Sequence, residues 1–142
     1  MIGAILGGVT LGLLSDRFGR RRAMIAALMG GMVMVPLWAY APSAALLALG
    51  ALLIQFMVQG AWGVIPAHLS ELSPDSVRGF MPGFAYQCGV LVASSVVYIE
   101  AIFAKRLTYA TAMALTAVTV FALAAIMTGI GKERKGTVFG AG

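Results

Sequence analysis

The chain has 142 residues, a length that ordinarily gives one compact domain in water, but its composition excludes a water-soluble protein. Hydrophobic residues make up 61% of the chain and charged residues 11%, too few to cover the surface of such a domain. The net charge of +5 therefore reports orientation in a membrane and not a nucleic-acid surface, because basic residues gather on cytoplasmic loops. We expect an all-α integral membrane protein that binds no nucleic acid.

The charged residues fall in clusters, and the uncharged runs between them predict the membrane-spanning helices. No charge occurs from Ala23 to Ala67, a run that as one helix would be roughly 68 Å long, over twice the bilayer core. The breaker at Tyr40–Ser43, which contains Pro42, divides this run. The runs are continuous and do not alternate, which excludes membrane strands. We expect a transmembrane domain over 1–131 with five helices, and a cytoplasmic tail over 132–142. The predicted helices cover about 1–14, 22–40, 43–66, 79–103 and 107–130.

The first of these segments is too short to cross a bilayer. Fourteen apolar residues reach only about 21 Å, less than the roughly 30 Å of the hydrocarbon core. The positive charges follow the apolar run, whereas in a signal peptide they precede it. We therefore expect that the beginning of this helix is missing and that the chain is a fragment.

The distribution of Lys and Arg predicts the orientation of the helices. Alternate ends of the predicted bundle contain eight and two basic residues, the two being Lys105 and Arg106. The end with eight includes the C-terminus, which is accordingly expected in the cytoplasm.

The link between the first two predicted helices is the segment Gly12-Leu-Leu-Ser-Asp16-Arg17-Phe-Gly19-Arg20-Arg21-Arg22. Asp16 is placed to accept backbone N–H groups at a helix start, and Gly19 permits the tight backbone of a short turn. The arginines are expected to pair with Asp16, or with carboxylates and helix C-termini of neighbouring segments. The alternative is a basic cytoplasmic loop that serves orientation only.

This segment resembles the signature loop of the major facilitator superfamily, G-x-L-x-D-R-x-G-R-R. A second segment, Glu71-Leu-Ser-Pro-Asp-Ser-Val-Arg78-Gly79, resembles the E-x-x-P-x-x-x-R-G loop of the same superfamily. The resemblance implies a partial major-facilitator helical bundle. With the short charged end Lys132–Gly140, it implies helices eight to twelve of a twelve-helix transporter, which lacks here its N-terminal half. By this resemblance a cytoplasmic gating network would latch the outward-facing state. Its residues would be Gly12, Asp16, Arg17, Gly19, Arg20, Glu71 and Arg78.

The stretch Gly60–Pro74, followed by Gly83–Gln87, is similar to proton symporters of organic anions, of the sialic acid and monocarboxylate type. The resemblance implies secondary active transport of a small organic solute, a carboxylate, across the inner membrane. Two six-helix halves would rock about a midplane site, coupled to protons. The rival interpretation is a truncated remnant or a small partner subunit that transports nothing.

Polar residues inside the predicted helices are candidates for the substrate cavity. Gln55, Gln59 and Trp62 share one face of the third helix at i, i+4 and i+7, and Gln87 lies on the fourth helix. Their amides suit a carboxylate or hydroxyl, and the indole suits an apolar portion of a substrate. The alternative is that these glutamines bind neighbouring helices to one another.

Glu100 is the acid inside an apolar run, which makes it a candidate for proton transfer or for pairing with Lys105 or Arg106. His68 is expected to be a structural residue at the cytoplasmic boundary. The spacings Gly3-x-x-x-Gly7 and Gly8-x-x-x-Gly12 indicate close helix packing. The sequence contains no nucleophile–His–acid set, phosphate loop or metal-ligand cluster, so we expect neither an enzyme nor a cofactor.

Overall fold

The computed structural model describes residues 1–132, and within this range it contains helices and no strand, which confirms the all-α prediction. Residues 133–142, which include most of the predicted tail, lie outside the described range. The elements in chain order are α1 (Ile2–Phe18), α2 (Arg20–Ala39), α3 (Ala44–Leu72), the short 3-10 helix η1 (Asp75–Val77), α4 (Met81–Ala93), α5 (Val96–Phe103) and α6 (Tyr109–Ile130).

Four spans among the described residues are long and apolar enough to cross a membrane. They are α2 with 20 residues, α3 with 29, α4 and α5 taken together with 23, and α6 with 22. The first helix, α1, has 17 residues and is not one of them. The protein is therefore a multi-pass membrane protein.

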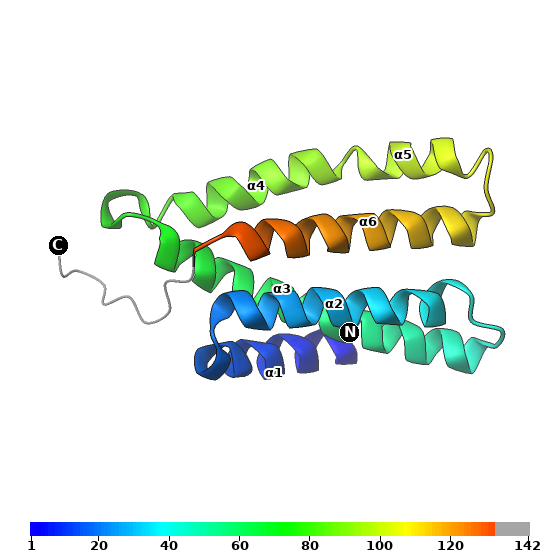
Figure 1. Cartoon of the computed structure of the whole chain (residues 1–142), viewed down its shortest axis with the longest axis horizontal. Coiled ribbons are helices and arrows are strands. Elements are labelled where there is room, and N and C mark those ends of the chain that lie inside the picture. The colour runs from blue at the N-terminus through cyan, green and yellow to red at the C-terminus, as the bar shows by residue number, and fades with distance from the viewer. Residues whose placement is uncertain (133–142) are drawn as a thin grey trace.

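The helices lie side by side as an elongated bundle (Figure 1). The first three helices pack on one another and α6 packs on α2, whereas α4 and α5 form an arm that contacts α3 at one end and α6 at the other. The α1–α2 and α3–α4 links and the end of α6 lie at one end of the bundle. The α2–α3 and α5–α6 links lie at the opposite end (Figure 1).

Two helices extend further than the charge pattern predicts. The α1 helix continues to Phe18 and includes Asp16, while α3 continues to Leu72 and includes Glu71. Pro66 lies inside α3 without ending it. Proline is tolerated in membrane helices when neighbouring groups replace the lost hydrogen bond. The charged residues thus do not end these helices, which continue as far as their backbone hydrogen bonds do.

The segment predicted as one helix over 79–103 is interrupted at Ser94 and Ser95. Each serine hydroxyl donates to a backbone carbonyl three residues earlier, Leu91 and Val92 respectively, at 2.7 Å. Such side-chain bonds compete with the helical backbone bonds and bend membrane helices. The arm is therefore two helices, α4 and α5, that follow one direction.

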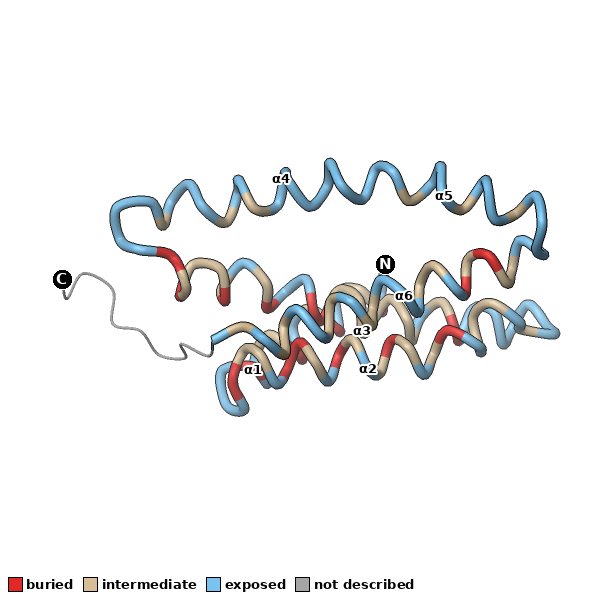
Figure 2. The backbone as a smooth tube through the Cα atoms, turned by 45° about the horizontal axis from the view of Figure 1, so that its top comes forward, coloured by how far each residue is buried: buried red, intermediate tan, exposed pale blue. Residues whose placement is uncertain are grey.

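Glycines permit close approach of α1 and α3. A Cβ added at Gly3 or Gly7 would overlap the carbonyl oxygen of Leu52 or Phe56 on α3. Close packing of this kind replaces the hydrophobic effect as the drive for association inside a bilayer. The spacing of Gly3 and Gly7 therefore has the role that the sequence indicates. Buried positions gather in α1, α2 and α3, and α4 and α5 contain none (Figure 2).

Candidate functional site

A single residue, Gly19, joins α1 to α2. Its φ of 102° is the one positive φ among the described residues, in a region that side chains with a Cβ rarely adopt. The Gly19 N–H donates to the Ser15 carbonyl at 3.0 Å, and the Ala23 N–H donates to the Gly19 carbonyl at 3.1 Å. The turn therefore continues the backbone hydrogen bonding of both helices and brings the ends of α1 and α2 together.

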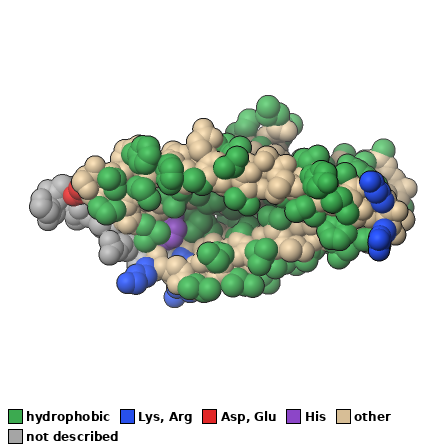
Figure 3. Space-filling model, turned by 90° about the horizontal axis from the view of Figure 1, so that it is seen from above, with side chains coloured by type: hydrophobic (Ala, Val, Ile, Leu, Met, Phe, Trp, Pro, Cys, Tyr) green, Lys and Arg blue, Asp and Glu red, His purple; other side chains and the backbone are tan. Residues whose placement is uncertain are grey.

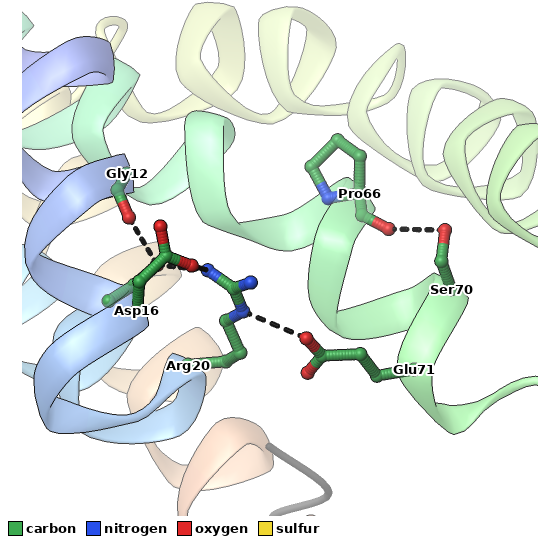
Figure 4. A network of polar contacts seen from close by, with 7 residues as sticks. Gly12, Asp16, Arg20, Pro66, Ser70 and Glu71 are labelled. Atoms are coloured by element: carbon green, nitrogen blue, oxygen red, sulfur yellow. Dashed lines mark hydrogen bonds and ion pairs between the residues drawn. The ribbon is translucent and has the colours of Figure 1, made fainter. Parts of the chain in front are cut away.

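Arg20, the first residue of α2, is the centre of a polar cluster (Figure 4). Its guanidinium donates to Ser15 Oγ at 2.6 Å, pairs with Asp16 Oδ1 at 2.5 Å and donates through Nε to Glu71 Oε1 at 3.1 Å. The side chains of Arg20 and Glu71 are 17% and 8% exposed, while that of Asp16 is 56% exposed. The arginine thus links the α1–α2 turn to the end of α3. Because Glu71 is buried, removal of Arg20 would leave a buried carboxylate without its cation.

Ser15 is a member of the cluster that the sequence reasoning missed. It is fully buried, and its hydroxyl donates to the Gly12 carbonyl at 2.6 Å while it accepts from Arg20. The buried residues of α1 are Gly3, Gly7, Leu11 and Ser15, a strict i+4 series that extends the glycine pattern. Following this period to its fourth member would have found Ser15.

Two buried atoms beside the cluster have no hydrogen-bond partner among the described residues, namely Glu71 Oε2 and His68 Nδ1. His68 lies inside α3 and is 8% exposed. Buried polar atoms are nearly always hydrogen-bonded in folded proteins. The end of α3 is therefore a place where donors from another segment would be accommodated.

Arg78 lies in a separate arrangement at the C-terminus of α3. It donates to the carbonyls of Ser70 and Ser73 at 3.0 and 3.2 Å and pairs with Asp75. A cation at these carbonyls satisfies groups that the helix end leaves open. These contacts give Arg78 a structural role in the α3–α4 link, next to the Arg20 cluster along the same helix.

Arg21 makes a contact with a helix C-terminus, one of the alternatives given for the arginines. Its guanidinium donates to the carbonyl of Gly129 in the last turn of α6. The contact joins α2 to α6 at the end of the bundle that contains the Arg20 cluster. Arg17 and Arg22 are exposed on the same end.

The four cavity candidates do not meet in one pocket. Trp62 is exposed on α3 and meets Tyr86 of α4 edge to face, with ring centroids 5.3 Å apart, beside a pocket of about 190 Å³. Gln55 is half-buried and lines a different space between α1 and α3, while Gln59 is half-buried between the two positions. Gln87 is exposed on α4. Their periodicity therefore places these residues on helix faces but does not bring them together around one cavity.

Glu100 is half-buried on α5, and within residues 1–132 neither Lys105 nor Arg106 lies within ion-pair distance of it. The structure thus lacks the interfacial pair considered for this acid. No group of three His, Cys, Asp or Glu residues in the described range is arranged to hold a metal ion.

Residues 1–130 match the family described as sugar (and other) transporter. A carboxylic acid transporter protein homolog of Saccharomyces cerevisiae is 38% identical over 74% of this chain, which spans 17% of that protein. The glucose transporter GlcP of Staphylococcus epidermidis is 35% identical over 56% of the chain and 18% of its own length. The putative metabolite transport protein YwtG of Bacillus subtilis is 33% identical over 71% of the chain and 23% of its own length.

The chain spans about a fifth of the length of these curated relatives. No solved structure matches the chain. The relatives are named as transporters, which agrees with the expectation that the chain is not an enzyme.

Proposed function

The chain belongs to the sugar (and other) transporter family of the major facilitator superfamily, and we propose that it contributes helices to a proton-coupled transporter of small organic carboxylates. One observation in particular supports a conformational switch within this chain. Arg20 connects the α1–α2 turn to the buried Glu71 at the end of α3. A charged pair of this kind changes the balance between two conformations when only one conformation contains it.

The proposed mechanism is alternating access with a latch at the arginine-rich end of the bundle. Arg20 and Glu71 form the latch within this chain, and Asp16 orients Arg20 from the exposed side. The second oxygen of Glu71 is buried and unpartnered among the described residues, so it would accept a donor from the other half of the transporter when this end closes. A planar guanidinium fits that task because it pairs with carboxylates through two N–H groups.

For the substrate, a carboxylate is favoured by the higher identity to the yeast carboxylic acid transporter homolog, 38% against 35% for the glucose transporter. The second candidate is a hexose, which the glucose transporter favours. Gln55, Gln59, Trp62 and Gln87 remain the proposed contributors to the cavity, and Glu100 a proposed proton carrier.

We assign the chain to helices eight to twelve, with the missing N-terminal half as its partner and the C-terminus in the cytoplasm of an inner-membrane protein. Orientation is tested by labelling with an impermeant thiol reagent in intact cells, after Cys88→Ser removes the native thiol. Pro42→Cys should label and Lys132→Cys should not. The reverse pattern would overturn the proposed orientation.

The transport proposal is tested with the complete gene that contains this chain, expressed and reconstituted in vesicles. We expect uptake of a radiolabelled monocarboxylate that rises with an inward proton gradient, and no glucose uptake.

Asp16→Asn retains shape and removes charge, so a loss of about 1–3 kcal/mol in one conformation should shift the ratio of conformations roughly 5- to 150-fold. Transport should fall while expression stays normal. Gln59→Ala should instead raise the substrate concentration for half-maximal uptake.

Glucose uptake without carboxylate uptake would favour the hexose carrier. Absence of any saturable uptake would favour the non-transporting remnant, which the named transporter relatives do not favour. Normal transport by Asp16→Asn would show that the α1–α2 link only sets the orientation of the protein in the membrane through its positive charges.

A further inference from the structure

An apolar groove lies between α6 and α5, the latter being part of the arm that has no buried residues. Its volume is about 410 Å³. The α5 wall is formed by Val96, Ile99 and Phe103, and the α6 wall by Leu115, Thr116, Thr119, Val120 and Leu123. From Leu115 to Leu123 the α6 wall advances eight residue steps, or about 12 Å along the helix axis. The groove is therefore an elongated channel that runs parallel to the helices.

The hydroxyl groups of the groove do not make it polar. Thr116 donates to the carbonyl of Ala112 at 2.9 Å, so its hydroxyl is satisfied within α6. The remaining lining side chains are hydrocarbon except for Thr119. A hydrocarbon ligand fits such a surface because it leaves no polar group unpaired.

Two cations lie in the α5–α6 link, shortly after Phe103, which lines the groove. Lys105 and Arg106 follow Phe103 by two and three residues in the link between α5 and α6. Both are exposed, and neither pairs with a carboxylate among residues 1–132. They lie at the end of the bundle opposite to the arginine cluster, and Figure 3 shows Lys and Arg side chains at both ends with hydrophobic side chains between them. Basic residues at this end run against the bias that sets orientation, so an anion there would explain them.

We propose that the α5–α6 groove binds an anionic phospholipid, with an acyl chain in the groove and the headgroup phosphate on Lys105 and Arg106. Long basic side chains reach from a helix end to the headgroup level, where phosphate lies. Basic pockets between membrane helices on the cytoplasmic side bind anionic headgroups. The same pairing is open to Lys105 and Arg106 at the opposite end, because phosphate groups lie at both faces of a bilayer. Glu100 lies deeper on α5 than the two cations and gives the site a net charge of +1, which favours an anionic headgroup over a neutral one. Apart from Glu100, which is also the proposed proton carrier, the site shares no residue with the proposed transport pathway, and the groove and its two cations do not depend on that pathway.

The test measures lipid retention by the purified protein in nanodiscs that contain equal amounts of phosphatidylglycerol and phosphatidylcholine, read by native mass spectrometry. Each basic residue near a phosphate contributes about a factor of five. The double change Lys105→Ala and Arg106→Ala should therefore lower the preference for phosphatidylglycerol roughly 25-fold. Arg22→Ala is the matched control, because Arg22 is exposed at the opposite end. It should change the preference less than about two-fold.

The groove is tested separately. Thr119→Trp fills it and should lower retention of both lipids, whereas Val118→Trp lies outside the lining and should not. A photoreactive benzophenone amino acid at position 119 should crosslink to lipid. Circular dichroism of each variant should match the parent protein because the changed residues are exposed.

An unchanged lipid preference in the double variant would overturn the proposal. An equal loss with Arg22→Ala would do the same, since it would show general charge attraction without a site. Crosslinking of position 119 to protein in place of lipid would show that another helix covers the groove, and would also overturn it.

Discussion

The three helices α1–α3 and the arm α4–α5 have the same apolar character but bury their side chains very differently. All six buried residues named for α3, and the buried series of α1, face neighbouring helices, while α4 and α5 have no buried residue. Hydropathy does not separate the two regions, because a bilayer supplies an apolar surrounding to both. What separates them is the presence of small residues opposite a neighbouring backbone. Close packing in this bundle therefore depends on which glycines face a neighbouring backbone, as Gly3 and Gly7 do and Gly12 does not, and not on hydrophobicity.

The polar groups follow the same division. The Arg20 cluster and its buried carboxylate lie at the end of the close-packed region, where Ser15 and Glu71 are inaccessible to solvent. The arm holds Gln87 and Cys88 in exposed positions. A buried charge needs fixed surroundings, so the polar site belongs to the packed helices.

The largest effect is expected from removing the cation of the packed region. Arg20→Ala leaves the buried Glu71 carboxylate without its partner, a loss that typically costs about 3–5 kcal/mol of unfolding free energy. Unfolding of the purified protein in sodium dodecyl sulfate, followed by circular dichroism, measures this loss. Glu71→Gln in the Arg20→Ala background should restore part of it. Arg22 is an exposed arginine of the same helix, so Arg22→Ala should change the unfolding free energy little. An equal loss with Arg22→Ala would contradict the special role of the buried Arg20–Glu71 pair.

A second, smaller loss is expected at the glycine contact. Gly7→Ala places a Cβ against the Phe56 carbonyl, so α1 and α3 must separate, at a cost of about 1–3 kcal/mol. Gly12→Ala is the matched change on the same helix, since no atom lies within 4 Å of its added Cβ. Its effect should be near zero or slightly stabilising. The same unfolding assay separates the two, and equal effects would contradict the packing role.

The turn between α1 and α2 should be sensitive to a Cβ for a different reason. Gly19→Ala forces an L-residue to φ 102° and ψ 147°, a region essentially restricted to glycine, which costs about 1–3 kcal/mol. Gly79→Ala serves as the control because Gly79 has a negative φ and open space around it. Gly19→Asn should not rescue this loss, because at φ 102° and ψ 147° Gly19 lies outside the left-handed helical region that Asn tolerates. Rescue by Asn would contradict the assignment to this backbone conformation.

The smallest effect is expected on the arm. Val92→Ala removes a side chain of α4 that is 72% exposed, and unfolding free energy should change by no more than about 0.5 kcal/mol. Val35→Ala on α2 makes the same chemical change at a residue that is 1% exposed, and should cost more because a cavity remains. A larger loss at Val92 than at Val35 would show that the arm is packed in the assembled protein.

The charge clusters predicted the helices and the two ends of the bundle, because moving charges into hydrocarbon is costly wherever the chain folds. They did not predict the end of α3, since a helix continues into the interface as long as its backbone bonds are satisfied. The resemblance pointed to Asp16, Arg20 and Glu71, and the structure brings these three together. The burial of Ser15 follows the i+4 period of α1, whereas the contact of Arg21 with Gly129 depends on how α2 and α6 lie side by side, which spacing along one helix does not specify.

The link of one residue between α1 and α2 has a mechanical consequence. A loop of several residues would let two helices tilt independently, whereas Gly19 leaves a single pair of backbone torsions between them. Because the hydrogen bonds of the Gly19 backbone continue those of both helices, we expect a displacement of the end of α1 to move the start of α2. The Arg21 contact then passes displacement of α2 to the last turn of α6. The helix ends at the arginine-rich end of the bundle are therefore expected to move together, with Gly19 as the pivot.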